Sequence, residues 1–289
     1  MSAPSSPRVR ALLLDALRRP EPFVAIELRP PRADLGPAAG MSEWIDVHHT
    51  LGRLSRAGRF VFLTDNAVGS EEEESLAHVG ANVGESVDLR HIVPILTCKH
   101  ALEYCRMFAS RAASDGFETL TVLGGDRSVG QPRCVPHGRD LRAIIRERHP
   151  ELALGGWVNP HRDPGRQLDF LAAPDAHNEY ALAQIVSHHS LDRVEAFLEE
   201  ARRREVEIPV VFGVFFYRSA NPRTLRVLSD FFPVPVEELT REFEGGVAAE
   251  EVCARTIRRL REAGAGRVYV SNLPSRGAER VLGRILERV

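Results

Sequence analysis

The sequence lacks the features that mark disulfide-stabilised, zinc-ribbon and membrane-spanning proteins. Its cysteines are few and far apart, and no two form a Cys-x-x-Cys pair, so neither a disulfide framework nor a zinc knuckle is indicated. They are Cys98, Cys105, Cys134 and Cys253, and we expect reduced thiols. No apolar run reaches the roughly 18 residues that a membrane-spanning helix needs.

A signal peptide is not indicated either. The first apolar run begins at Val9 and is interrupted by Asp15 and then by Arg18 and Arg19, before a cleavage site can follow. We expect this run to form an amphipathic helix, within an amino-terminal helical extension of residues 1–20, in a cytoplasmic protein.

The sequence has no excess of charge of one sign. It contains 38 basic and 40 acidic residues, and no basic segment is interleaved with aromatic residues, so nucleic acid is not expected as a partner. Metalloprotease, nucleophile-elbow and Walker motifs are absent, so the common hydrolase and phosphate-loop classes lack support. We expect a small-molecule substrate, no bound metal, and a monomer or small homo-oligomer.

Short apolar runs rich in β-branched residues recur along the whole chain. Each run is continuous rather than alternating, which is typical of parallel strands that are buried on both faces. The eight runs are residues 23–28, 60–64, 92–97, 119–123, 153–158, 181–186, 209–215 and 267–270. Helical patterns lie between them, at 101–114, 139–147, 191–203 and 250–263. Strand and helix therefore alternate through the chain.

Eight such repeats predict a closed barrel. We expect an α/β fold, a single (β/α)8 TIM barrel over residues 1–289, because eight parallel strands with helical crossovers close on themselves. An open doubly wound sheet is the alternative, but Arg29-Pro30-Pro31-Arg32 follows the first strand where a dinucleotide-binding fold has a glycine-rich turn. The connection between strands seven and eight is enlarged, with extra helical pieces at 221–231 and 236–243.

Polar residues follow or interrupt several of these strands. In such a barrel, side chains at the carboxyl ends of the strands surround the reaction centre. The candidates are Glu27, Thr64, Asp65, Thr97, Asp126, Asn159, His161 and Gln184.

Three of these candidates carry the chemistry, and each has a plain structural alternative. The apolar neighbours of Glu27 predict a raised pKa and a general acid, whereas an ion pair with a nearby arginine such as Arg29 is the alternative. Asp126 follows two glycines and presents a carboxylate at the mouth, unless it serves only as a turn or cap residue. Gln184 holds either a ligand with an amide edge or an internal hydrogen bond.

Two histidine pairs, His48-His49 and His188-His189, suggest a metal site at first sight. Adjacent residues on a helix or a strand point in different directions and make poor joint ligands, so we expect neither pair to bind a metal.

At these strand ends the sequence resembles methylenetetrahydrofolate reductase, in order from about residue 23 to about residue 215. The segment from Ala25 to Arg32 is similar to the family's first-strand motif, a glutamate followed by Pro-Pro-Arg. Four further segments match in order: Leu96-Thr97-Cys98, Leu123-Gly124-Gly125-Asp126, Trp157 to His161, and Ala183-Gln184.

The resemblance implies a reduction of methylenetetrahydrofolate by NADH or NADPH. Glu27 would protonate the bridging nitrogen, Asp126 would offset the positive charge of the iminium ion, and Gln184 would bind the folate or the nicotinamide. Thr64 would contribute to the folate site. The cofactor-binding residues would be Thr97, Trp157, His161 and Gln184, and Arg218 or Arg223 would meet the glutamate tail.

The sequence departs from the family's pattern where the usual cofactor, FAD, is bound. Gly124, Ala172 and Ala173 stand where the family has basic residues, and Ile95 replaces a histidine. Because a pyrophosphate needs cationic partners, we expect weak flavin binding or none, with direct hydride transfer from NAD(P)H, unless Arg162 or Arg166 substitutes.

Other functions fit the same residues. A pterin-binding methyltransferase or synthase barrel would need no nicotinamide, with Asp126 anchoring the pterin ring. A non-catalytic relative would bind folate or a protein partner on the same fold. The pterin of the substrate could also be a tetrahydromethanopterin-like relative of folate.

Overall fold

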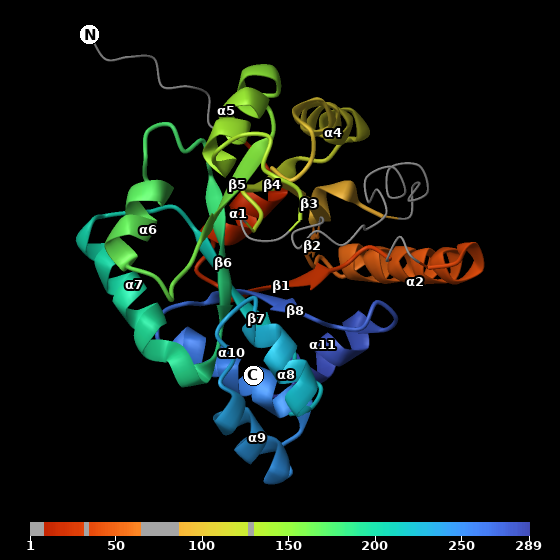
Figure 1. Ribbon diagram of the computed structural model, residues 1–289, viewed down its shortest axis with the longest axis vertical. Helices are drawn as coiled ribbons and strands as arrows, with labels where there is room; N and C mark the ends of the chain where they lie inside the picture. The colour runs from red at the N-terminus through yellow and green to blue at the C-terminus, as the bar shows by residue number, and fades with distance from the viewer. Residues whose placement is uncertain (1–8, 32–34, 65–86, 127–129) are drawn as a thin grey trace.

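The eight apolar runs form eight parallel strands that close into a barrel (Figure 1). The structure is a computed structural model and describes residues 9–31, 35–64, 87–126 and 130–289. Each strand pairs with its neighbour in the chain, and β1 also pairs with β8, with Ile26 opposite Val270. The expected (β/α)8 fold is confirmed.

The strand bounds agree closely with the sequence pattern. The strands are β1 (Phe23–Leu28), β2 (Val61–Leu63), β3 (Ile92–Thr97), β4 (Thr119–Leu123), β5 (Ala153–Val158), β6 (Tyr180–Val186), β7 (Val210–Phe215) and β8 (Arg267–Ser271). Four have the predicted bounds and the others differ by one or two residues. Thr64 lies beyond β2, although its backbone N–H still donates to the Leu28 carbonyl at 2.9 Å.

In the described part of the chain, helices lie between the strands and cover the barrel. The described helices are α1 (Leu12–Arg18), α2 (Pro37–Arg56), α4 (Leu102–Asp115), α5 (Gly138–Arg148), α6 (Pro164–Leu171), α7 (Leu191–Arg203), α8 (Pro222–Ser229), α9 (Val236–Glu244), α10 (Ala249–Glu262) and α11 (Ala278–Leu286), with 3-10 turns η2 (Leu89–His91) and η3 (His188–Ser190). Both α6 and α8 begin with an Asx cap followed by proline, because the side chains of Asp163 and Asn221 accept backbone N–H groups of the first turn.

The amino-terminal helix α1 packs against the amino-terminal end of the barrel. Its Leu13, Leu14 and Leu17 are buried in the same cluster as the inward side chains of the strands. Two hydrogen bonds hold it at the strand starts: Leu12 N–H donates to Glu118 Oε2 at 2.7 Å, and Arg267 Nε donates to the Leu17 carbonyl at 2.5 Å. This helix covers the end of the barrel opposite the carboxyl ends of the strands.

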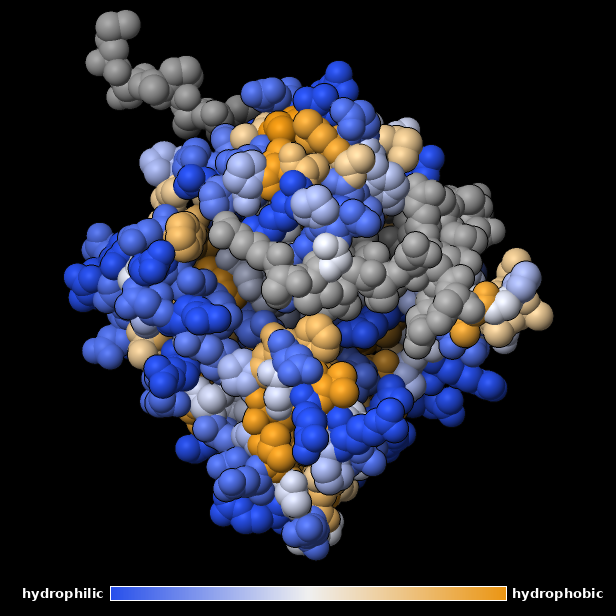
Figure 2. Space-filling view, in the orientation of Figure 1, coloured by the Kyte–Doolittle hydropathy of each residue, from blue (hydrophilic) through white to orange (hydrophobic). Residues whose placement is uncertain are grey.

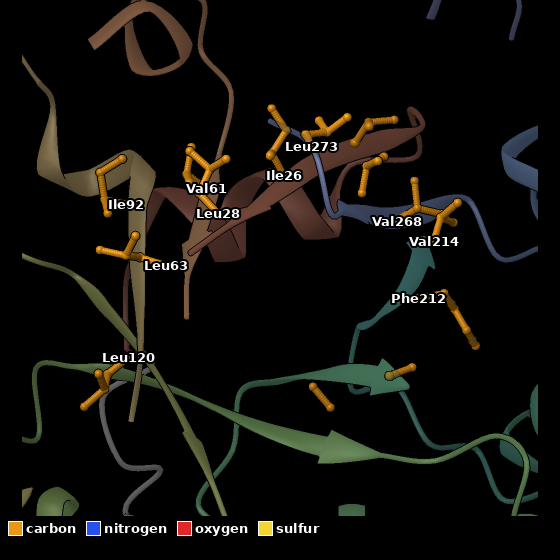
Figure 3. Packing of buried hydrophobic residues seen from close by; sticks show 14 of the residues in the cluster. Ile26, Leu28, Val61, Leu63, Ile92, Leu120, Phe212, Val214, Val268 and Leu273 are labelled. Carbon is orange, nitrogen blue, oxygen red and sulfur yellow. The ribbon is translucent and has the colours of Figure 1, made fainter. Parts of the chain in front are cut away.

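The strands bury both faces. Ile26, Val61, Leu63, Val214 and Val268 belong to the cluster between the sheet and the helices (Figure 3). The residues next to them along each strand point into the barrel and form a second cluster. This two-sided burial explains why the runs are continuously apolar.

Aromatic side chains fill the middle of the barrel. The ring centroids of Phe62 and Tyr269 lie 6.0 Å apart, and the Tyr180 hydroxyl lies 2.6 Å from Thr121 Oγ1. A Cβ atom at Gly155 would lie 2.3 Å from Tyr180 Cζ, so the absence of a side chain there makes room for the tyrosine ring. The barrel is a packed core, and a ligand has room only at its ends.

The enlarged connection between strands seven and eight is confirmed, and it consists of α8, α9 and α10. Hydrophobic residues gather on the surface over α8 and the segment after it (Figure 2), where Val227, Phe231 and Val236 are exposed. In the described part of the chain, no helix is both long and apolar enough to cross a membrane.

Candidate functional site at the carboxyl end of the barrel

Glu27 lies near the carboxyl end of β1 and follows the inward positions Phe23 and Ala25. Burial raises the pKa of the Glu27 carboxyl, whereas the charge of Arg29 and a hydrogen bond with Ser271 lower it by less. Ser271 is the buried last residue of β8, which pairs with β1. The predicted raised pKa of Glu27 is confirmed. The charge of Arg29, which was the alternative, lowers this pKa by less than burial raises it.

The raised pKa makes stability depend on pH. The neutral Glu27 carboxyl contributes its full stability below its ordinary pKa of 4.5, and that contribution is lost as the pH rises through the raised pKa of the folded state. We expect the free energy of unfolding of the wild type to fall relative to that of Glu27→Gln as the pH rises above 4.5. Urea denaturation of both proteins from acid to alkaline pH measures this difference, and parallel curves would contradict the raised pKa.

The turn after β4 carries Asp126 at the rim, as the sequence predicted. It follows Gly125, whose φ of +72° favours glycine, and a Cβ atom there would lie 2.7 Å from Lys99 Cγ. The buried Lys99 follows β3, and its Nζ donates to the Gln131 carbonyl at 2.8 Å. Asp126 itself is partly exposed.

A charged side chain lies beside Gly124. A Cβ atom at Gly124 would lie 2.8 Å from the guanidinium carbon of Arg133, so this arginine occupies the space of the missing side chain. Its two terminal nitrogens donate to the carbonyls of Gly125 and Pro136. Arg133 therefore places a cation at this point of the rim, and two of its nitrogens hold the loop.

Polar side chains with unmet hydrogen-bonding capacity lie at two other strand ends. Among the described residues, Thr64 Oγ1 after β2 and the Tyr217 hydroxyl after β7 are buried and have no hydrogen-bond partner. Such groups usually find a partner, and a polar molecule bound at this end of the barrel would supply one. Thr97, at the end of β3, is fully buried and accepts the Lys99 N–H at 3.4 Å, so it shapes the turn after its strand.

Gln184 is engaged within the protein. Its Oε1 accepts the N–H of Ile185 at 2.9 Å and its Nε2 donates to the Phe231 carbonyl at 3.4 Å. The pairing of β6 with β7 shifts register between Leu182 and Ile185, which is why the amide side chain can turn back onto its own strand. The internal hydrogen bond considered from the sequence is therefore present, and a role in ligand binding stays a prediction.

Trp157 and His161 lie on and after β5. Trp157 is 38% exposed although it is a strand residue, so its ring is accessible to a ligand. His161 Nε2 lies 2.8 Å from the Ile185 carbonyl and must carry the proton, because a carbonyl oxygen only accepts. Asn159 Oδ1 accepts the His161 N–H at 3.0 Å, which fixes the turn between them.

Several residues that were considered for binding the flavin pyrophosphate or the folate glutamate tail lie on the surface. Ala172 ends α6 and is exposed, Ala173 is partly exposed, and Arg162, Arg166 and Arg223 are exposed. Arg218, also exposed, donates to the Asn272 carbonyl at 3.3 Å. Arg32 and Asp65 lie outside the described residues.

The sequence pattern did not indicate that Ser271, Lys99 and Tyr217 lie near the candidate site. Ser271 had a signal, because Arg267 and Tyr269 set an alternation that carries residue 271 to the inner face. For the other two, position relative to the barrel mouth depends on loops whose course the sequence pattern does not define.

A hollow of about 630 Å³ lies elsewhere, at the amino-terminal side of the barrel. It is lined by residues of α1, α7 and α10 and by the start of β7, and none of the candidate site residues is among them. Because the polar strand ends gather at the other end, we place the candidate site there.

Comparisons with known proteins identify the fold. An uncharacterised protein from Clostridium thermocellum, which binds two copies of 5-methyl-5,6,7,8-tetrahydrofolic acid, has a TM-score of 0.62 at 13% identity, over 96% of this chain and 97% of that chain. An F420-dependent secondary alcohol dehydrogenase, in complex with an F420-acetone adduct, has a TM-score of 0.52 at 12% identity, over 93% and 98%. No protein-family profile and no curated protein matches the sequence.

Proposed function

We propose that the protein binds a reduced folate at the carboxyl end of the barrel and reduces methylenetetrahydrofolate to methyltetrahydrofolate with NADH or NADPH. The observation that carries the proposal is the Glu27 carboxyl, which burial keeps protonated to higher pH, within hydrogen-bonding contact of Ser271 at the rim. A protonated carboxyl at this place is suited to general acid catalysis.

The proposed chemistry uses one proton and one hydride. Glu27 donates its proton to the bridging nitrogen of methylenetetrahydrofolate, the carbon–nitrogen bond of the five-membered ring breaks, and an iminium ion forms. The Asp126 carboxylate stabilises the positive charge. Hydride from NAD(P)H then adds to the methylene carbon, and methyltetrahydrofolate and NAD(P)⁺ leave.

Two further observations support the binding of a folate. The structurally similar Clostridium thermocellum protein binds a methylated tetrahydrofolate on the same fold. The exposed ring of Trp157 and the unpartnered hydroxyls of Thr64 and Tyr217 offer an aromatic face and hydrogen-bonding groups, which a pterin ring can use.

We further propose that the hydride passes directly from NAD(P)H to the folate, without bound flavin. Position 124 lacks the family's arginine, and Arg133, which takes its space, donates to backbone carbonyls. Positions 172 and 173 are alanines. We expect the purified protein to be colourless after dialysis, and stoichiometric flavin absorbance in the blue would contradict direct transfer.

A methyltransferase or synthase that binds the pterin ring is the second candidate function. The same structural similarity favours it, because the Clostridium thermocellum protein binds methyltetrahydrofolate, which is a methyl donor as well as a reduction product. The two functions differ in their need for nicotinamide.

A steady-state assay separates these functions. We expect NADH or NADPH oxidation that depends on methylenetetrahydrofolate and yields one methyltetrahydrofolate for each nicotinamide consumed. Folate binding without any nicotinamide oxidation would favour the methyltransferase or a non-catalytic protein, and the absence of folate binding would contradict all three.

A further inference from the structure

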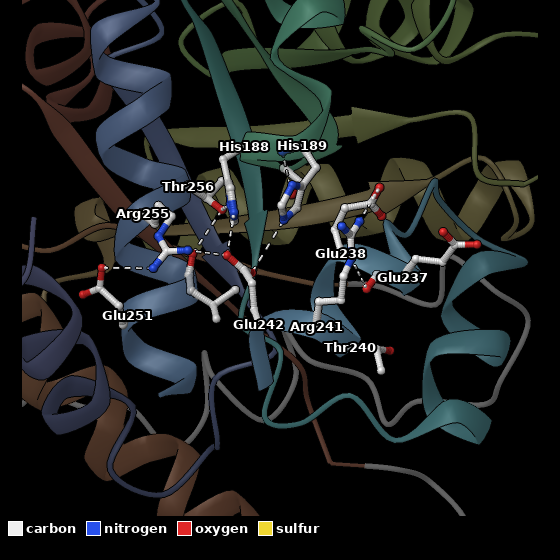
Figure 4. A network of polar contacts seen from close by, with 12 residues as sticks. His188, His189, Glu237, Glu238, Thr240, Arg241, Glu242, Glu251, Arg255 and Thr256 are labelled. Atoms are coloured by element: carbon white, nitrogen blue, oxygen red, sulfur yellow. Dashed lines mark hydrogen bonds and ion pairs between the residues drawn. The ribbon is translucent and has the colours of Figure 1, made fainter. Parts of the chain in front are cut away.

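Two adjacent histidines and a distant glutamate converge beside the barrel rim (Figure 4). His188 and His189 are the first residues of η3, one residue after β6 ends, and Glu242 lies on α9 in the connection between β7 and β8. His188 Nε2 lies 3.1 Å from Glu242 Oε1, and His189 Nε2 lies 3.6 Å from Glu242 Oε2. The expectation that adjacent histidines diverge is wrong here.

The tight turn of η3 brings the two rings together. Ser187 Oγ accepts the His189 N–H at 3.3 Å, and the Ser190 hydroxyl accepts the Ser187 N–H at 3.2 Å. The ring centroids of His188 and His189 are therefore only 3.9 Å apart. Neither a regular α-helix nor a strand places neighbouring side chains in this way.

The distances suit a tetrahedral metal ion. Two ligand atoms that are each about 2.1 Å from such an ion lie roughly 3.4 Å apart, between the two distances to Glu242. One candidate ligand atom from each of the three side chains lies within 4.8 Å of the others. Glu242 Oε2 is buried and has no hydrogen-bond partner among the described residues. This carboxylate oxygen therefore faces His189 without accepting a hydrogen bond, which is unusual for a buried acceptor.

His188 is oriented by a hydrogen bond with a neighbouring hydroxyl group. Its Nδ1 lies 2.8 Å from Thr256 Oγ1, and that hydroxyl also lies 3.2 Å from the Val252 carbonyl. When the Thr256 hydroxyl donates to the Val252 carbonyl, it accepts a hydrogen bond from the Nδ1–H group of His188. Nε2 of His188 then carries no proton and faces Glu242, as in metal sites where a second hydrogen bond orients the histidine.

Arg255 is the competing cation. Its guanidinium lies 2.5 Å from Glu242 Oε1 and 3.9 Å from Glu251 Oε1, and its side chain is partly exposed. It can therefore keep Glu251 as its ionic partner when another cation takes Glu242.

We propose that His188, His189 and Glu242 bind one divalent transition-metal ion of the zinc class, with water as the fourth ligand. The ion joins α9 to the end of β6, the strand on which Gln184 contacts Phe231 of the same connection. Its role is structural: it holds the β7–β8 connection against the rim of the barrel. This inference does not depend on the proposed reductase activity.

Cobalt replaces zinc and reports its coordination. Untagged protein is treated with a chelator, dialysed and titrated with CoCl₂. We expect a visible absorption band of low-coordinate Co²⁺ that saturates at one equivalent and disappears when one equivalent of Zn²⁺ is added. We also expect Zn²⁺ to raise the melting temperature of the chelator-treated protein.

Variants locate the ion. Glu242→Gln and His189→Ala should each weaken Co²⁺ binding by roughly a hundredfold or more, while circular dichroism shows that both are folded. His49→Ala changes an exposed histidine of the other adjacent pair and is the matched control, which should leave the band unchanged. If one ligand variant fails to fold, the other still decides the result.

Arg255→Gln distinguishes a metal site from a network of ion pairs. Removal of the competing cation should tighten Co²⁺ binding by roughly tenfold. The proposal is overturned if wild-type protein gives no cobalt band, if the band survives in both ligand variants, or if Arg255→Gln only destabilises the protein without tightening metal binding.

Discussion

Replacement of Glu27 by Gln is expected to lower turnover of methylenetetrahydrofolate by about 10²- to 10⁴-fold and to leave folate binding nearly unchanged. The amide has the shape of the carboxyl but no acidic proton to donate, so the proposed ring-opening step would lose its general acid. Binding is retained because the neutral amide replaces a carboxyl whose raised pKa already favours the neutral form. Single-turnover kinetics with saturating NADH, together with a fluorescence titration of folate binding, measures both quantities.

Two variants serve as controls for this prediction. Glu21→Gln changes an exposed carboxylate two residues before β1 and should have wild-type turnover. Ser271→Ala removes a hydrogen bond that lowers the Glu27 pKa, so the alkaline limb of the rate profile should move to higher pH. Wild-type turnover by Glu27→Gln would remove this residue from the mechanism.

Replacement of Gly155 by Ala is expected to destabilise the protein by about 3 kcal/mol, at the upper end for overpacking. The new Cβ atom would lie 2.3 Å from Tyr180 Cζ and 2.6 Å from its hydroxyl oxygen. The ring cannot withdraw easily, because it is fully buried and its hydroxyl is bonded to Thr121. Urea denaturation gives the change in the free energy of unfolding.

Gly283→Ala is the matched control for this packing prediction. Gly283 lies within α11, and a Cβ atom there would meet nothing within 4 Å. Alanine should stabilise the helix by about 0.5–1 kcal/mol, since it has less backbone freedom to lose. Equal effects of the two substitutions would contradict the packing described for the barrel interior.

The barrel could be predicted because its strands are buried on both faces. Continuous apolar runs such as 92–97 and 153–158 gave the strand bounds directly, and their number predicted closure. β2 was the least accurate, because Phe60 and Thr64 continue its pattern and hydrogen-bond to β1 through their backbone but lie outside the strand bounds. Hydropathy indicates which residues are buried, and buried residues continue beyond those that pair with the neighbouring strand.

Candidate residues could be placed from the sequence only where they lie on a strand or directly after one. Glu27 follows from its place in an apolar strand, and its raised pKa from the apolar neighbours. The internal bonds of Gln184 depend on a register shift and on a carbonyl 47 residues away, which no local pattern reveals. The approach of Arg133 to Gly124 and of Glu242 to His188 likewise depends on how connections fold back across the barrel.

Transfer of deuterium from NADH or NADPH labelled at C4 tests the proposed reaction most directly. The label is placed on either face of the nicotinamide, and the product is analysed by mass spectrometry without added flavin. We predict that one of the two labelled forms gives methyltetrahydrofolate with a single deuterium in its methyl group. A complete absence of methyltetrahydrofolate with both labelled forms of NADH and of NADPH, from folded protein that binds the folate, would contradict the proposed flavin-independent reduction.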